Sequence, residues 1–249
     1  MNIIIFDTET TSLSKPFCYN IGYVIANTET KTILTQHDIV ISEVWNNKML
    51  FSTAYYADKR EKYIASMKGR NTQKTKWLDA INIIANDIET YGVQHGYAYN
   101  SSFDEGVFDF NADWFKTFNP FENVAIHDIR AFACHDFVDD NYKEWCETYK
   151  KFTESENYST TAETMFGYLM GCDDYVEEHT ALADSIIEWA ILKESIERGT
   201  NICIDLKIAK SFPRNIERTL TIDYNGIKTT YNYRIKREKK STNTIYLKG

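Results

Sequence analysis

Several features common in proteins are scarce or missing here, and each absence excludes a class of protein. Only three prolines occur in 249 residues, which argues against long disordered linkers. No apolar run reaches the roughly eighteen residues that a membrane-spanning helix needs. The first residues lack a basic stretch followed by an apolar one, so we expect no secretory signal. These absences predict a folded, cytoplasmic protein that does not enter a membrane.

Cysteine pairs are missing as well. The five cysteines are odd in number and widely spaced, with no C-x-x-C pair among them. Such cysteines are typical of free thiols in a reducing compartment. The sequence is rich in Asn, Lys, Ile and Tyr, as expected of an AT-rich genome. We therefore expect a bacterial cytoplasm, or a host cytoplasm if the protein is encoded by a phage.

Positive charge is scarce in most of the chain and concentrated at one end. The net charge is −8, but residues 200–249 carry eleven basic and four acidic residues, a balance of +7. An acidic body with a basic tail suggests contact with a polyanion. A tail that only keeps the protein soluble is the alternative, and charge alone does not decide between them.

The pattern of apolar residues predicts an α/β fold. Apolar and β-branched runs predict strands, and apolar positions at helical spacing predict helices. Strands followed by strands that alternate with helices indicate a mixed sheet. The expected strands are Ile3–Phe6, Cys18–Ala26, Thr32–Ile41, 93–99 and 124–129, and the expected helices are 75–91, 103–118, about 142–152, 160–170 and 180–198.

The end of the chain has a different pattern. Two alternating runs, 219–224 and 227–235, flank Asn225-Gly226, which is the strongest short signal for a β-hairpin. We therefore predict a main domain over residues 1–199 and a basic, β-rich extension over 200–249.

Residues 42–70 are less regular and mix aromatic with basic side chains. Such a mixture can stack on a single nucleic-acid strand and neutralise it. Alternatively, the aromatic residues pack a loop and a short helix onto the domain. The residues concerned are Trp45, Phe51, Tyr55, Tyr56, Tyr63, Lys48, Lys59, Arg60, Lys62, Lys68 and Arg70.

The first predicted strand leads directly into two acidic residues, Asp7 and Glu9. Side chains two positions apart on a strand point the same way, so both carboxylates lie on one face. Buried carboxylates are costly unless they are paired, and hard divalent cations are a common partner. A surface turn rich in Thr and Asp is the alternative explanation of this pair.

Two later segments could supply partners for these acids. Asp104 lies where a predicted strand passes into a helix, and His179 and Asp184 lie at the start of the last predicted helix. Five positions on a helix span about 140°, so these two can converge only if His179 precedes the helix. Thr180 is a plausible N-cap for such a helix.

Taken together, the motifs D-x-E (Asp7, Glu9), N-x-x-F-D (ending at Asp104) and H-x-A-L-x-D (His179 to Asp184) resemble those of the DEDDh exonucleases. This is the DnaQ-like branch of the ribonuclease H-like superfamily. The resemblance covers residues 1–198 and implies a mixed five-stranded sheet flanked by helices, with the basic hairpin as an addition. The residue before Asn100 is Tyr99, whereas the commonest family pattern has a histidine at that position.

The resemblance implies a two-metal 3′→5′ exonuclease that releases nucleoside monophosphates. Asp7, Glu9, Asp104 and Asp184 would hold two ions, with Asp7 shared, and His179 would act as general base. Four carboxylates without thiolates suit Mg²⁺ or Mn²⁺ better than zinc. Single-stranded DNA is the expected substrate, in replication or repair. There are two alternatives: an exonuclease that trims RNA, and an accessory module that docks onto a polymerase or other replication partner. The sequence does not decide the oligomeric state.

Two finer expectations concern substrate and pH. By resemblance, the end of the substrate strand would contact Thr8, Thr10, Leu13, Asn100 and Phe103, although core packing is an alternative for Leu13 and Phe103. The acids that precede His179 should raise its pKa and move the activity optimum to alkaline pH, unless they face solvent and are screened. These acids are Asp173, Asp174, Glu177 and Glu178.

Overall fold

A computed structural model describes residues 1–214, 217–224 and 227–234. The chain divides into two compact units, each described by itself below. The first comprises Met1–Tyr149 and Thr160–Ile208, and the second comprises Lys150–Ser159 and Ala209–Gly249.

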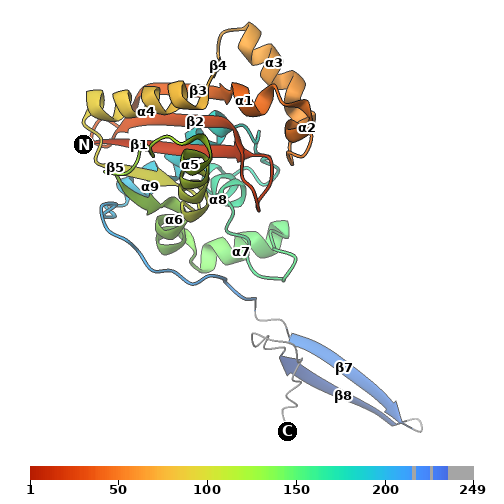
Figure 1. Cartoon of the computed structure of the whole chain (residues 1–249). Coiled ribbons are helices and arrows are strands. Elements are labelled where there is room, and N and C mark those ends of the chain that lie inside the picture. The colour runs from red at the N-terminus through yellow and green to blue at the C-terminus, as the bar shows by residue number, and fades with distance from the viewer. Residues whose placement is uncertain (215–216, 225–226, 235–249) are drawn as a thin grey trace. The chain divides into compact units, whose positions relative to one another are not determined.

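The first unit is organised around a mixed sheet (Figure 1), which confirms the predicted fold class. Strand β1 pairs antiparallel with β2 and parallel with β5, so the sheet order is β4-β3-β2-β1-β5-β6. Five of its strands are the expected ones, and the three-residue β4 extends the sheet to six. The strands are β1 (Asn2–Thr10), β2 (Cys18–Asn27), β3 (Thr32–Ile41), β4 (Gln73–Thr75), β5 (His95–Ala98) and β6 (Ala125–Asp128).

Helices surround this sheet and largely follow the apolar pattern of the sequence. The helix at 129–137 was not expected, because its apolar residues directly continue those of strand β6. The helices are α1 (Ser42–Trp45), α2 (Lys48–Phe51), a 3₁₀ turn (Ala57–Lys59), α3 (Arg60–Lys68), α4 (Trp77–Tyr91), α5 (Ser102–Phe115), α6 (Ile129–Phe137), α7 (Asp140–Tyr149), α8 (Ala162–Met170) and α9 (Ala181–Glu197).

The two faces of β1 have different roles because its side chains alternate. Ile4 and Phe6 point into the main hydrophobic core, which the inner sides of α4 and α5 complete. Phe6 stacks on Phe121 with ring centroids 4.4 Å apart. The alternate positions, including Asp7, face helix α9, which packs along β1 and β2. The core therefore fixes the strand from one side and leaves the acids on the other.

The second unit contains the predicted hairpin. Strands β7 (Glu217–Tyr224) and β8 (Ile227–Arg234) pair antiparallel, and the Asn225-Gly226 turn lies outside the described residues. In the same unit the Arg214 guanidinium lies 3.6 Å from the centre of the Phe152 ring.

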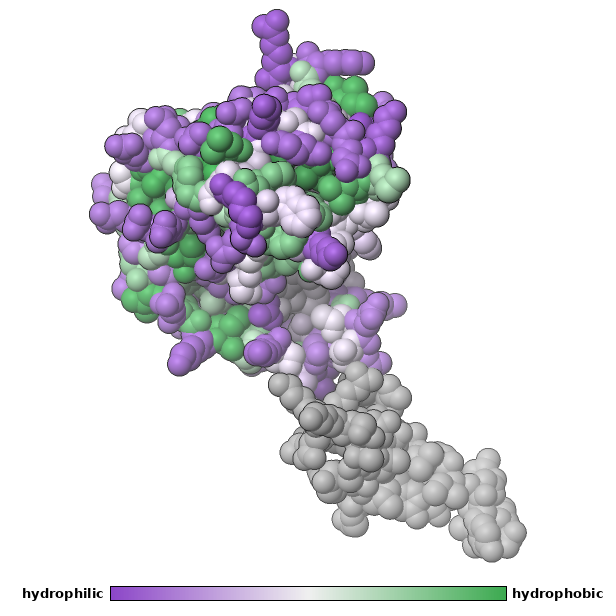
Figure 2. Space-filling model, in the orientation of Figure 1, coloured by the Kyte–Doolittle hydropathy of each residue, from purple (hydrophilic) through white to green (hydrophobic). Residues whose placement is uncertain are grey.

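Within the described part of the chain, no helix is both long and apolar enough to cross a membrane. Polar side chains cover much of the face seen in Figure 2, with apolar ones in small groups between them.

Candidate active site

The carboxyl end of β1 places two acids beside the neighbouring strand β2. In the register of this pair, Asp7 lies opposite Gly22 and Glu9 opposite Asn20. Directly opposed residues of an antiparallel pair project from the same face. The D-x-E spacing therefore puts both carboxylates on the face that α9 covers.

Helix α9 approaches this face unusually closely. A Cβ atom at Gly22 would lie 2.0 Å from the carbonyl carbon of Ala181, so only glycine fits there. The Asn20 Oδ1 accepts the N–H of Ala181 at 3.0 Å, and the Ser185 hydroxyl donates to the Gly22 carbonyl at 3.0 Å. These contacts hold the first turn of α9, and with it Asp184, over the acids of β1.

Three of the predicted metal ligands converge. Asp7, Glu9 and Asp184 each offer an oxygen within 4.8 Å of those of the other two. Asp104, in the first turn of α5, is 2% exposed, and its Oδ1 accepts the Thr8 hydroxyl at 2.6 Å. Asp104 is also among the charges that raise the pKa of Asp7. We call Asp7, Glu9, Asp104 and Asp184 the acid centre.

The acid centre is strained electrostatically when no cation is bound. Burial raises the pKa of Asp7, and the charges of Asp104 and other acids raise it further. Burial likewise raises the pKa of Asp104 and of Asp184 to about 7. The Oδ1 atom of Asp184 is buried without a hydrogen-bond partner. Buried carboxylates that repel one another, one of them with an oxygen that no donor reaches, fit hard divalent cations such as Mg²⁺ or Mn²⁺.

His179 lies just before α9, as convergence with Asp184 requires. The helix begins at Ala181 with Thr180 as N-cap, although the Thr180 side chain makes no capping bond. The φ angle of His179 is +48°, a left-handed conformation that is uncommon for a residue with a side chain. The backbone N–H of His179 donates a hydrogen bond to the Asp184 carboxylate, which links the two residues.

Contacts from other segments hold the His179 ring. It stacks on Tyr56 with ring centroids 4.5 Å apart and planes 12° apart. Its Nδ1 lies 3.6 Å from the Glu177 Oε2, and one atom each of Glu163, Glu177 and His179 lies within 4.8 Å of the others. Lys59 lies 4.3 Å from the centre of the Tyr56 ring. We call these five residues the histidine corner.

The expectation that neighbouring acids raise the pKa of His179 is wrong. Burial lowers this pKa below its ordinary value, and the positive charge of Lys59 lowers it further. The acid nearest to its ring, Glu177, is itself largely buried, which raises its pKa to about 8, so it carries little charge at neutral pH. Lys62 pairs with Glu178. His179 is therefore a neutral imidazole near pH 7.

The predicted substrate contacts have very different surroundings. Thr8 is buried against Asp104, and the Thr10 hydroxyl lies 3.4 Å from the Ser12 carbonyl. Leu13 is 85% exposed, which excludes core packing for it. Phe103 is partly buried against the core. Asn100 is exposed at a φ of +62°, and its N–H donates to the Asp128 Oδ1 at 2.8 Å.

Residues 42–70 mostly pack onto the body. Trp45, Phe51 and Tyr63 are buried, and the Arg60 guanidinium lies 4.2 Å from the centre of the Trp45 ring. Tyr55 is different, since it is 86% exposed while its ring touches Tyr56 at a centroid distance of 4.8 Å. The packing alternative therefore holds for most of the aromatic residues, and Tyr55 is exposed next to the histidine corner.

Glu188 is not among the site residues predicted from the sequence, although its spacing from Asp184 is a signal. Glu188 is four positions after Asp184 on α9, and residues at this spacing share a helix face. Its charge raises the pKa of Asp7. The roles of Tyr56 and Lys59, by contrast, had no local signal, because their neighbours come from distant segments.

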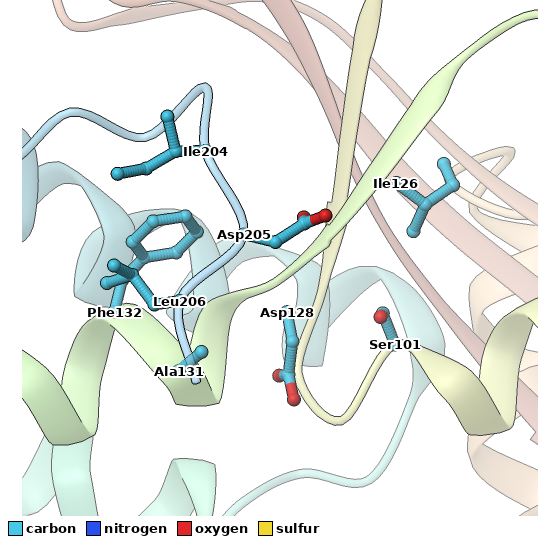
Figure 3. A pocket seen from close by; sticks show the side chains of 8 residues that line it. All are labelled: Ser101, Ile126, Asp128, Ala131, Phe132, Ile204, Asp205 and Leu206. Atoms are coloured by element: carbon cyan, nitrogen blue, oxygen red, sulfur yellow. The ribbon is translucent and has the colours of Figure 1, made fainter. Parts of the chain in front are cut away.

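A separate pocket lies at the β6 edge of the sheet (Figure 3). Its volume is about 300 Å³, and it contains none of the predicted site residues. Next to it, the His127 Nδ1 lies 3.0 Å from the Asp205 Oδ1, and the Tyr97 hydroxyl donates to the Ile202 carbonyl at 2.9 Å. These contacts fasten residues 202–205 onto the sheet. The pocket is lined by Ser101, Ile126, Asp128, Ala131, Phe132, Ile204, Asp205 and Leu206.

Among the solved structures with a similar fold are three nucleases. A 3′-exonuclease studied for 3′-end-specific recognition of a histone mRNA stem-loop is 11% identical, with a TM-score of 0.53 over 92% of this chain and 89% of that one. A full-length 3′-exonuclease is 12% identical, with a TM-score of 0.51 over 81% and 84% of the two chains. E. coli exonuclease I, in complex with a 5cy-dT13 oligonucleotide, is 13% identical, with a TM-score of 0.50 over 79% of this chain and 40% of its own.

No family model and no curated protein matches the sequence. The structural likeness nevertheless defines the fold. The chain has the α/β fold of these 3′-exonucleases and of exonuclease I, and the fold class inferred from the three motifs is confirmed.

Proposed function

We propose that the protein is a divalent-metal-dependent 3′→5′ exonuclease that hydrolyses the terminal phosphodiester of single-stranded DNA and releases nucleoside monophosphates. The observation that carries the proposal is the convergence of Asp7, Glu9 and Asp184, whose oxygens lie within 4.8 Å of one another. The exonuclease fold supports it. Replication or repair is the expected setting.

The acid centre would hold two ions, with Asp7 shared between them. Bound there, the ions would stabilise the charge that develops on the phosphate and the leaving oxygen. The chain's own part is to hold four carboxylates in place before binding. Strand β1 fixes Asp7 and Glu9, helix α9 fixes Asp184, and the Thr8 hydroxyl orients Asp104.

His179 would accept a proton from the attacking water. A general base must be unprotonated at the working pH, and burial and Lys59 keep the pKa of His179 low. The stacked Tyr56 ring restricts rotation of the imidazole. Leu13 and Asn100, both exposed, would be free to contact the terminal nucleotides.

The test uses single-stranded DNA and RNA oligonucleotides labelled at the 3′ or the 5′ end, with Mg²⁺, Mn²⁺ or EDTA. We expect immediate release of the 3′ label as a mononucleotide and progressive shortening of 5′-labelled DNA. Asp7→Ala and His179→Ala should abolish both signals. Activity that survives EDTA or Asp7→Ala would contradict the proposal. Faster cleavage of RNA than of DNA would reassign the substrate and retain the mechanism.

The basic tail is proposed to bind the nucleic-acid backbone. Residues 209–249 contain ten basic and three acidic residues. Truncation should follow Ile208, because Ile202 and Asp205 contact the sheet of the first unit. We expect the truncated chain to bind DNA more weakly, with a flatter salt dependence, because fewer phosphate charges are neutralised. Unchanged affinity and salt slope would assign the tail another role.

A further inference from the structure

Glu188 is a buried acid that has no role in the mechanism proposed above. It lies in the third turn of α9 and is only 3% exposed. Its carboxylate accepts a backbone N–H of Tyr99, but its Oε2 is buried without any hydrogen-bond partner. A buried charged oxygen without a partner is costly and requires an explanation.

The surroundings of this oxygen are the acid centre. Glu188 is close enough to Asp7, Asp104 and Asp184 for their charges to act on one another. Asp184 precedes Glu188 by four positions, so both side chains lie on the same face of α9. None of the described basic residues forms an ion pair with Glu188.

A purely structural role explains these contacts poorly. A Gln or Met of similar size would fill the same space on α9 without adding a further charge to four acids. Without a cation this cost is relieved by protonation, since burial and the charges of Asp104 and Asp184 raise the pKa of Glu188 well above its ordinary value. The ionised carboxylate is stabilised when positive charge enters the acid centre. Glu188 does not belong to the group formed by Asp7, Glu9 and Asp184, whose oxygens lie within 4.8 Å of one another, so it would act on a bound ion from outside that group.

We propose that Glu188 is a fifth carboxylate of the metal centre, which strengthens divalent-ion binding from behind Asp7 and Asp184. The inference rests on the proposed metal-dependent function. Mg²⁺ keeps several of its water molecules when it is bound to a protein, and the unpartnered Oε2 of Glu188 would accept a hydrogen bond from such a water. Partners of this kind typically change metal affinity by 10- to 100-fold. Glu188 is thus a positioning residue and touches neither the substrate nor the scissile bond.

The experiment is a calorimetric titration of the full-length chain with Mn²⁺ at neutral pH, for the wild type, Glu188→Gln and Glu194→Gln. Glu194 lies on the same helix and is partly exposed, so its variant is the matched control. We expect Glu188→Gln to bind Mn²⁺ about tenfold or more weakly, and Glu194→Gln to bind it like the wild type. Glu188→Met replaces Glu188→Gln if that variant does not fold.

A second readout separates metal binding from catalysis. The Mn²⁺ concentration for half-maximal nuclease activity should rise about tenfold in Glu188→Gln, with the same rate at saturating Mn²⁺. Equal or tighter Mn²⁺ binding by Glu188→Gln would overturn the inference and leave the proposed function intact. Failure of the wild type to bind Mn²⁺ would overturn both.

Discussion

The acid centre and the histidine corner lie side by side but are built in different ways. The acids are carried by a central strand and by the first turns of two helices, with the core packed behind β1. The ring of His179 is held by side chains, through a stack on Tyr56 and a contact with Glu177. Backbone geometry therefore places the proposed ligands, whereas side-chain packing places the proposed base.

This difference has a physical consequence. The acid centre is electrostatically unfavourable by itself, because burial and mutual repulsion raise the pKa of its carboxyl groups. In the histidine corner, burial lowers the pKa of His179 and raises that of Glu177 to about 8, so both are mostly neutral near pH 7, and the remaining charges, on Lys59 and Glu163, are of opposite sign. Substitutions should therefore affect metal binding in the first region, and proton transfer alone in the second.

The largest effect is expected from Asp7→Asn. It removes a charge that both ions would share, so activity should fall on the order of 10³-fold or more, and Mn²⁺ binding should be lost. The metal-free variant should be at least as heat-stable as the wild type, because one source of buried repulsion disappears. Nuclease assays, calorimetry and thermal unfolding in EDTA measure the three quantities. Glu89→Gln, on the exposed side of α4, is the control.

His179→Asn should reduce kcat by roughly 10²- to 10⁴-fold, the range typical of a lost general base. Metal affinity should stay within about twofold of the wild type, because the ring is not among the carboxylates of the acid centre. Single-turnover assays at saturating Mn²⁺ and calorimetry test the contrast with Asp7→Asn. If His179→Asn loses metal binding as well, the division into two regions fails.

Tyr56→Ala should have a smaller effect, on the order of a tenfold loss of kcat, because the imidazole would sample unproductive orientations. Tyr56→Phe keeps the ring and should retain nearly full activity, since the stack involves the ring face. The KM for the oligonucleotide should change little in either variant. Equal losses in both variants would point to the hydroxyl group and contradict the stacking explanation.

The smallest effect concerns stability without metal. Asp104 and Asp184 have a pKa near 4 when unfolded and about 7 when folded. Their protonation stabilises the fold fully below pH 4, and this contribution is lost as pH rises through about 7. The Tm in EDTA should therefore fall from pH 5 to pH 8, and Mn²⁺ should raise it more at pH 8. A Tm in EDTA that rises over this range would contradict the buried acid centre.

Much of this arrangement could be predicted from local pattern. The alternation of β1, the helical spacing in α4 and α9 and the Asn-Gly hairpin signal each depend on neighbouring residues, and the elements formed where expected. Helix α6 was missed because its apolar run continues directly from β6. The direction of the His179 pKa shift was wrong because sequence proximity to acids does not measure which of them are charged or which cations face the ring.

The sequence by itself determined that Asp7 and Glu9 share one face, because a strand repeats every two residues. It also determined the order of the motifs and the start of the last helix near His179. Only the tertiary structure decided that Gly22 of β2 lets α9 approach the sheet, that Tyr56 and Lys59 lie beside the imidazole, and that the Glu188 charge acts on Asp7. The reason is that local periodicity sets the direction of a side chain, whereas its neighbours depend on long-range packing and burial.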